Sequence, residues 1–118
     1  MHTKILGVRV VGDNITGDIV FFTIEDVYYV DLFTPKKNYR VPRFHTSKGV
    51  FTVLLTLDSC KKAFRENLVQ LDSGNLVNIS KIRFVKETVF SLTAHFDNGV
   101  TANISRNKRK KVAHLIKP

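Results

Sequence analysis

The 118 residues carry a formal net charge of +9, with 43% hydrophobic and 25% charged side chains. A chain of this length forms one domain that buries about 65% of its unfolded surface, and such a composition is typical of globular rather than disordered proteins. The longest apolar stretches fall far short of the roughly 20 residues that cross a bilayer, so we expect no membrane span. We also expect no secretory signal, and the single Cys60 fits a reducing cytoplasm.

The first half of the chain is predicted to consist mostly of strands. They are expected where β-branched and aromatic residues gather, at residues 5–11, 19–23, 27–33, 39–44 and 50–55. The intervening turns are expected at residues 12–18, 34–38 and 46–49. Pro35 supports the second turn, because proline cannot donate a hydrogen bond to a sheet ladder.

One short helix is predicted at residues 57–66, after the strands. Thr56 is a suitable N-cap, and Leu57, Cys60, Ala63 and Phe64 recur at helical spacing. This spacing turns Cys60 toward the core. No histidine stands near it in the sequence, so we expect a packing role for this thiol rather than a nucleophilic one.

The last third is expected to return to strands and to end in a second helix. Loop-forming residues occupy 72–75, and strands are predicted at 82–86, 88–96 and 100–104. Within residues 88–96 the alternation places Phe90, Leu92, Ala94 and Phe96 on one face and His95 on the other, where it meets solvent or packs on the sheet.

Two local signals mark the end of the chain. Asn98-Gly99 predicts a type I′ hairpin turn, which needs a positive φ at both positions. Ser105 can cap a final helix with a narrow apolar stripe of Val112, Leu115 and Ile116, leaving residues 106–110 outside.

The positive charge is concentrated in two windows that contain no acid. Residues 32–57 have a net charge of +5 and residues 98–118 have +6, whereas residues 1–31 have −3 and residues 58–97 only +1. Clustered cations favour a polyanionic partner, because neutralising phosphates releases counterions.

Catalytic and metal-binding patterns are missing from the sequence. The histidines, His2, His45, His95 and His114, are scattered, and there is neither a glycine-rich phosphate loop nor a GxSxG elbow. We therefore expect no enzyme activity, no metal and no cofactor.

Several segments together resemble the LytTR DNA-binding domain of bacterial transcription regulators. They are the strand at 25–31, the short helix, the Val77-Asn78-x-x-x-Ile82 segment, and the hairpin that runs into Ser105-Arg106. The resemblance covers about residues 16–116. It implies a mainly β, elongated antiparallel fold of several short sheets with one or two short helices. It also implies sequence-specific binding of double-stranded DNA through loops in the grooves. Regulators of this family commonly carry a receiver domain, but here a strand is expected within five residues of Met1. We therefore expect a single domain over 1–118 without a receiver domain, either as a stand-alone regulator or as an excised domain.

The resemblance points to three DNA-facing loops, at 34–38, 72–75 and 103–108. The expected DNA-binding residues are Lys36, Lys37, Asn38, Ser73, Asn75, Ser105, Arg106, Asn107, Lys108 and Lys110. Lysines and Arg109 suit phosphates, whereas Arg106, Asn107 and Asn38 suit base edges. Asn78 and Ser80 are expected to be structural.

The loop at 72–75 departs from the family pattern. The family usually has Arg-x-His-Arg/Asn-Ser there, and this chain has Gln70-Leu71-Asp72-Ser73-Gly74. Asp72 can either accept from a cytosine amino group or cap the loop.

The resemblance also implies promoter direct repeats as the target, and a homodimer on DNA is compatible with it. The alternative function is an RNA-binding or ribosome-associated basic β domain that stacks bases on Tyr28, Tyr39, Phe44 or Phe51. A protein-interaction module is the third candidate.

Overall fold

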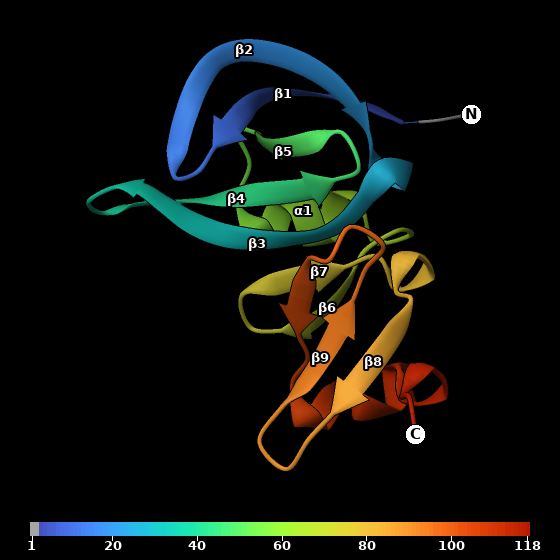
Figure 1. Cartoon of the computed structure of the whole chain (residues 1–118). Helices are drawn as coiled ribbons and strands as arrows, with labels where there is room; N and C mark the ends of the chain where they lie inside the picture. Colours follow the sequence, from blue (N-terminus) through green and yellow to red (C-terminus); the bar gives the residue numbers. More distant parts are fainter. Residues whose placement is uncertain (1–2) are drawn as a thin grey trace.

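The computed structural model describes residues 3–118, so His2 lies outside the described residues. Within that range ten strands form two antiparallel sheets, which confirms the mainly β fold (Figure 1). The larger sheet has the order β2-β1-β5-β4-β3-β7-β6 and the smaller one β10-β9-β8. Their bounds are β1 (Lys4–Val11), β2 (Asn14–Thr23), β3 (Val27–Lys36), β4 (Tyr39–Thr46), β5 (Gly49–Thr52), β6 (Val69–Asp72), β7 (Asn75–Val77), β8 (Phe84–Glu87), β9 (Leu92–His95) and β10 (Thr101–Asn103).

The helical segments are short. Among residues 3–118, α1 (Leu57–Ala63) is the only α-helix, and 3₁₀ turns occupy Ile24–Asp26, Ile79–Lys81, Arg106–Lys111 and Ala113–Leu115. As predicted, Thr56 caps α1, since its hydroxyl accepts from the Ser59 amide at 3.0 Å. Cys60 is fully buried, whereas Ala63 is exposed and the α-helix ends there. No helix within residues 3–118 is long and apolar enough to cross a membrane.

The first half of the chain packs around a cluster of phenylalanines. Phe22 stacks on Phe51 with ring centroids 4.9 Å apart, and both lie against Phe44. The strands around these rings bury all three of them, and α1 contributes Cys60 to the same cluster. Aromatic surface of this size adds much to the apolar area removed from water.

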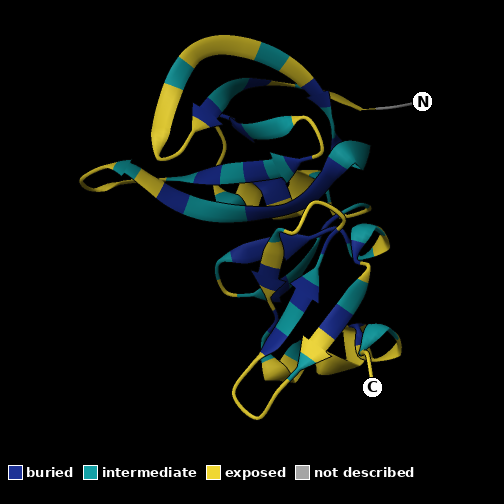
Figure 2. Ribbon diagram, viewed as in Figure 1, coloured by how far each residue is buried: buried dark blue, intermediate teal, exposed yellow. Residues whose placement is uncertain are grey.

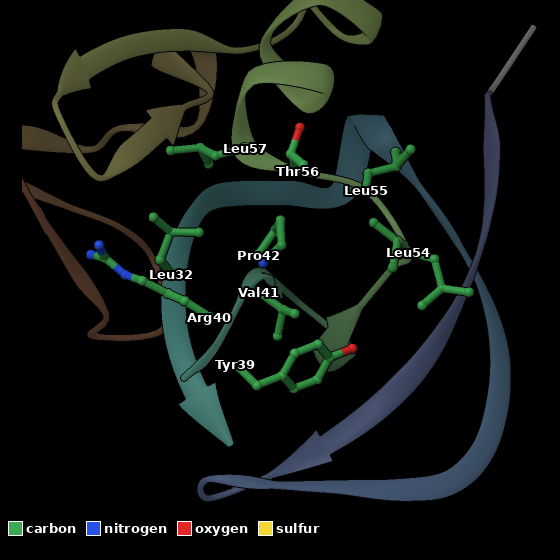
Figure 3. A pocket seen from close by; sticks show the side chains of 10 residues that line it. Leu32, Tyr39, Arg40, Val41, Pro42, Leu54, Leu55, Thr56 and Leu57 are labelled. Carbon is green, nitrogen blue, oxygen red and sulfur yellow. The ribbon is translucent and has the colours of Figure 1, made fainter. Parts of the chain in front are cut away.

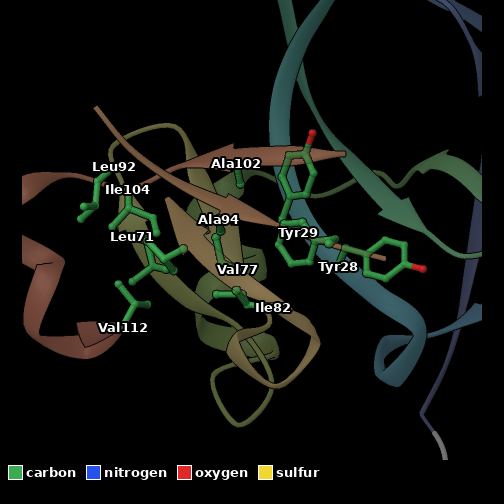
Figure 4. Close-up of a cluster of buried hydrophobic side chains, with 12 residues drawn as sticks. Tyr28, Tyr29, Leu71, Val77, Ile82, Leu92, Ala94, Ala102, Ile104 and Val112 are labelled. Carbon is green, nitrogen blue, oxygen red and sulfur yellow. The ribbon is translucent and has the colours of Figure 1, made fainter. Parts of the chain in front are cut away.

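A second apolar cluster joins the smaller sheet to the larger one. Ala94, Val85 and Ala102 from β8–β10 meet Val77 of β7, and Val112 of the C-terminal segment is fully buried among them (Figure 4). Leu115 and Ile116 pack against the same cluster, so the predicted apolar face of Val112, Leu115 and Ile116 is confirmed. Strand β3 serves both clusters, because Tyr28 and Tyr29 point into this one while Val27 and Val30 belong to the first.

Two predicted turns are shorter than expected. Strand β2 begins at Asn14, so the turn-rich segment at 12–18 is mostly strand and the hairpin turns at Gly12 and Asp13. Strand β3 likewise continues through Pro35 to Lys36. The register with β4 shifts between Phe33 and Lys36, and such an irregularity accommodates a proline that has no N–H to donate.

The segment at 88–96 is a strand only from Leu92, so Phe90 does not share the buried face of Leu92, Ala94 and Phe96 as expected and is 95% exposed. Thr88 accepts hydrogen bonds from the amides of Phe90 and Ser91, and this local turn interrupts the ladder. Leu92, Ala94 and Phe96 are buried as predicted, and His95 stacks on Phe84 with ring centroids 4.6 Å apart.

The hairpin at Asn98-Gly99 exists, but its turn is not type I′. Among the described residues around it, only Gly99 has a positive φ, at 83°. The Gly99 amide donates to the Phe96 carbonyl, and the Phe96 amide donates to the Val100 carbonyl. This pattern is that of a three-residue loop closed by a left-handed glycine.

The second predicted helix is a run of 3₁₀ turns, and Ser105 does not cap it through its side chain. The hydroxyl of Ser105 donates to Asp72 instead. Strand β6 was not predicted, because four residues of mixed polarity carry little periodic signal.

Candidate nucleic-acid interface

The turn between β3 and β4 presents two cations and an amide to solvent. Lys36, Lys37 and Asn38 are all exposed, and the Lys36 ammonium lies 5.7 Å from the centre of the Tyr39 ring. Asn38 has a φ of 62°, a left-handed conformation that asparagine tolerates better than most residues. Among residues 3–118 neither lysine is paired with a carboxylate, so both charges are available to a ligand.

The turn between β6 and β7 is tied to the end of β10. Asn75 is only 5% exposed, and its side-chain amide donates to the Asn103 carbonyl at 2.7 Å. The Asp72 carboxylate accepts from the Ser105 hydroxyl at 2.6 Å. The Ser105 amide donates to the Leu71 carbonyl at 2.7 Å, so these contacts clamp the two predicted DNA-facing loops to each other.

This clamp changes the expected roles of three residues. Asn75 is almost fully buried and donates its amide to Asn103, and the Ser105 hydroxyl donates to Asp72, so both side chains hold the loops together. Asp72 therefore bonds across the fold, neither capping its own loop nor standing free. Ser73 is the side chain of this turn that remains exposed.

Asn78 and Ser80 are structural, as expected. The buried amide of Asn78 donates to the Val27 carbonyl at 3.0 Å, and its oxygen accepts from the Ser80 hydroxyl at 2.7 Å. These bonds join the segment after β7 to the start of β3.

Arg106 is held by the β8–β9 turn. Its guanidinium donates to the Glu87 carboxylate at 3.1 Å and to the carbonyls of Thr88 and Val89. Arg109 forms two further bonds to the same carboxylate, at 2.8 and 3.1 Å. The hydrogen bond from Arg109, with the added charge of Arg106, holds the pKa of Glu87 below its usual range.

The other polar side chains between Arg106 and Lys111 face solvent or a cleft. Asn107, Lys110 and Lys111 are exposed, whereas Lys108 is half-buried. Lys108 and Lys111 line a cleft of about 500 Å³ together with three cations of and after α1, namely Lys61, Lys62 and Arg65. Within the cleft Asp58 is the one acid, and it pairs with Lys62 at 3.1 Å.

The three cations at the α1 side are functional candidates that were not predicted from the sequence. The net charge of residues 58–97 is only +1, so a sum over this range does not reveal that three of its cations lie close together. Their spacing along the chain, at 61, 62 and 65, was the available signal, because residues three or four apart share a helix face.

Two apolar hollows lie in the first half of the chain, and Tyr39, which follows the turn between β3 and β4, lines both of them. One of about 470 Å³ is lined by side chains around Pro42 and Leu54 (Figure 3), and a second of about 280 Å³ lies beside it, sharing Tyr39 and Leu54. Neither contains an acid or a histidine. Among residues 3–118 no group of three or more His, Cys, Asp or Glu could hold a metal ion.

The buried ionisable groups serve the fold. Burial would raise the pKa of Asp31, but hydrogen bonds from His45 at 2.9 Å and Arg43 at 3.0 Å outweigh it and lower that pKa. Burial raises the pKa of Tyr29 to about 12 and that of the Cys60 thiol to about 11, so neither ionises near neutral pH.

Comparison with known proteins gives a consistent picture. A family model described as LytTr DNA-binding domain matches residues 17–117. One matching solved structure is the LytTr DNA-binding domain of a protein described as a methyl-accepting/DNA response regulator from Bacillus cereus. The two share 13% identity, the match covers 96% of each chain, and the TM-score is 0.71. A search of curated proteins found no match.

Proposed function

The chain belongs to the LytTR family of DNA-binding domains, and from that premise we propose that it recognises specific double-stranded DNA sites as a transcription regulator. The observation that carries the proposal is the pair of cationic segments at Lys36-Lys37, in the turn between β3 and β4, and at Lys108–Lys111, after β10. Among residues 3–118 no carboxylate pairs with the lysines of either segment. Clustered, unpaired cations on tight turns are suited to phosphates at fixed spacing.

We assign the contacts by chemistry and exposure. Lys36, Lys37, Lys108 and Lys110 contact phosphates, and the exposed hydroxyl of Ser73 adds a neutral donor. Asn38 and Asn107 are exposed amides that can pair with adenine. Asn75 and Ser105 are left out of this set and position the loops instead.

Arg106 is the assigned guanine reader, and it must change partners to act. Its guanidinium already donates to three oxygen atoms, so bidentate pairing with a guanine requires it to release Glu87 or the β8–β9 turn. Glu87 therefore restrains the base reader until DNA is present.

The cleft between α1 and the C-terminal segment extends the phosphate-binding surface. Lys61, Lys62 and Arg65 add to Lys108 and Lys111 there, and the neighbouring Val69 and Gln70 belong to β6, the outer strand that leads into the turn carrying Ser73. A DNA backbone that follows this edge passes from the cleft to the turn.

The salt dependence of binding tests the proposal. Duplexes are first selected from genomic fragments, and affinity is then measured by fluorescence anisotropy between 50 and 200 mM salt. Replacing Lys36 and Lys37 by alanine should reduce the slope of log K against log salt by about two, because each phosphate contact contributes about 0.9. Lys4→Ala with Lys48→Ala removes the same charge away from this turn and should leave the slope unchanged. Equal slopes for the two double variants would contradict the proposal.

The target is proposed to be promoter direct repeats, bound by two copies in the cytoplasm. RNA binding is the weaker alternative, because Tyr28, Phe44 and Phe51 are buried and only Tyr39 of the four candidate stacking aromatics is exposed. Competition between the selected duplex and folded RNA separates these functions.

A further inference from the structure

The turn between β8 and β9 carries two of the most exposed apolar side chains among the described residues. Val89 is 86% and Phe90 is 95% exposed. The ring of Phe90 contributes to neither apolar cluster, so the fold gains no core packing from it. An aromatic side chain left in water in this way is available to a partner.

The turn is rigid. The Thr88 hydroxyl accepts from the amides of Phe90 at 3.2 Å and Ser91 at 3.0 Å, and the Thr88 amide donates to the Ser91 carbonyl at 2.8 Å. Arg106 holds the same turn from outside through the carbonyls of Thr88 and Val89. A fixed backbone loses little entropy when its side chains are buried against a ligand.

The surroundings of this apolar tip are cationic. Arg106 and Arg109 lie beside it, Lys86 precedes it on β8, and the nearby carboxylate of Glu87 is occupied by the two arginines. Cations around an apolar tip suit a ligand with anionic edges and apolar faces. Duplex DNA has both, in its phosphates and in its sugars, bases and thymine methyl groups.

We propose that Val89 and Phe90 form an apolar contact of the DNA-binding surface, placed in the groove beside the base contacted by Arg106. This inference rests on the proposed function. It adds a contact that is neither charged nor hydrogen-bonded.

The test compares Phe90→Ala with Leu54→Ala on a selected duplex that contains one site. Leu54 is also 95% exposed, but it lines the apolar hollows of the first half of the chain. We expect Phe90→Ala to weaken binding about tenfold with an unchanged salt slope, since no phosphate contact is lost. Phe90→Leu, which keeps an apolar side chain, should recover most of the affinity. Thermal unfolding should be unaffected by both Phe90 variants.

Three outcomes overturn the inference. Equal affinities of the Phe90→Ala and Leu54→Ala variants would show that the ring does not touch DNA. A loss seen only on a duplex with two tandem sites would assign the ring to a contact between two copies. A reduced salt slope would mean that the substitution acts through the neighbouring arginines. If the unaltered protein binds no duplex, the proposed function itself fails, which is a separate result.

Discussion

At the scale of single residues, Glu87 controls the most positive part of the molecule. Its carboxylate accepts hydrogen bonds from both Arg106, which is proposed to contact guanine, and Arg109. One carboxylate thus neutralises part of the positive charge of the C-terminal segment and fixes the orientation of two guanidinium groups.

Glu87→Gln should loosen this control. With the carboxylate removed, we expect affinity for unselected duplex to rise about threefold to tenfold at 0.1 M salt and the salt slope to steepen by about one. Discrimination between selected and unselected DNA should fall, because the arginines lose their fixed position. Asp18→Asn makes the same charge change on the exposed part of β2 and serves as the control. If both substitutions change affinity and discrimination equally, the change in net charge explains the result and Glu87 has no specific role.

The bond between Ser105 and Asp72 is a second residue-scale determinant, in this case of stability. Ser105→Ala removes the donor and leaves a half-buried carboxylate without its partner, so we expect a loss of about 1–2 kcal/mol in the free energy of unfolding by urea. Ser73→Ala, which removes an exposed hydroxyl, should change stability by less than about 0.5 kcal/mol. A similar loss for both variants would argue against the cross-link.

At the scale of elements, the sequence predicts strands better than their ends. Alternating and β-branched segments identify β1, β3, β4 and β9, because their side-chain period matches the pleat of a sheet. Their limits depend on strand register and on side-chain hydrogen bonds, which the apolar pattern does not show. Strand β3 passes through Pro35 because the register with β4 shifts there, and β9 starts late because the Thr88 hydroxyl captures two amides.

The hairpin between β9 and β10 depends on one glycine. Gly99 has a φ of 83°, and an added Cβ would find open space but a disfavoured backbone. Gly99→Ala should therefore cost about 1–2 kcal/mol of stability in thermal or urea unfolding. Gly17→Ala, within β2 and also in open space without a positive φ, should be neutral or slightly stabilising. If both substitutions lower stability equally, the positive φ of Gly99 does not explain the loss.

At the scale of the whole molecule, β3 couples the two halves. It contributes Tyr28 and Tyr29 to one apolar cluster and Val27 and Val30 to the other. It pairs with β4 on one side and with β7 on the other (Figure 1). The same strand ends in the turn that carries Lys36 and Lys37. The position of the first cationic turn relative to the second therefore depends on a single continuous strand.

The ion cluster on β3 and β4 makes this unit sensitive to acid. Asp31 has a lowered pKa through His45 and Arg43, so its contribution to stability is present above about pH 4, the pKa of an unfolded aspartate, and is lost as pH falls below it. At pH 7, Asp31→Asn should cost about 2 kcal/mol. Urea unfolding of both proteins should show that difference shrinking below about pH 4, and a difference independent of pH would refute the assignment.

The candidate site was only partly predictable. Lys36, Lys37, Lys108 and Lys110 were expected to contact phosphates because of the family resemblance and because they lie in the two basic windows without acids. Asn75 and Ser105 were assigned to DNA because the sequence does not show that β7 and β10 lie close enough to use those side chains on each other. The cleft of α1 was missed for the same reason, since its cations come from segments more than 40 positions apart.

The outermost strand of the larger sheet has a further consequence. Strand β2 has a neighbour on one side only, and Ile19 and Phe21 on it are 69% and 67% exposed (Figure 2). An open edge with apolar side chains is a template on which another chain can add a strand, the first step of aggregation. Asp18 and Gly17 interrupt the apolar pattern on this strand, as a charge and a weak strand former do at protected edges. Solubility during purification should thus depend on β2, a strand that carries none of the residues proposed to contact DNA.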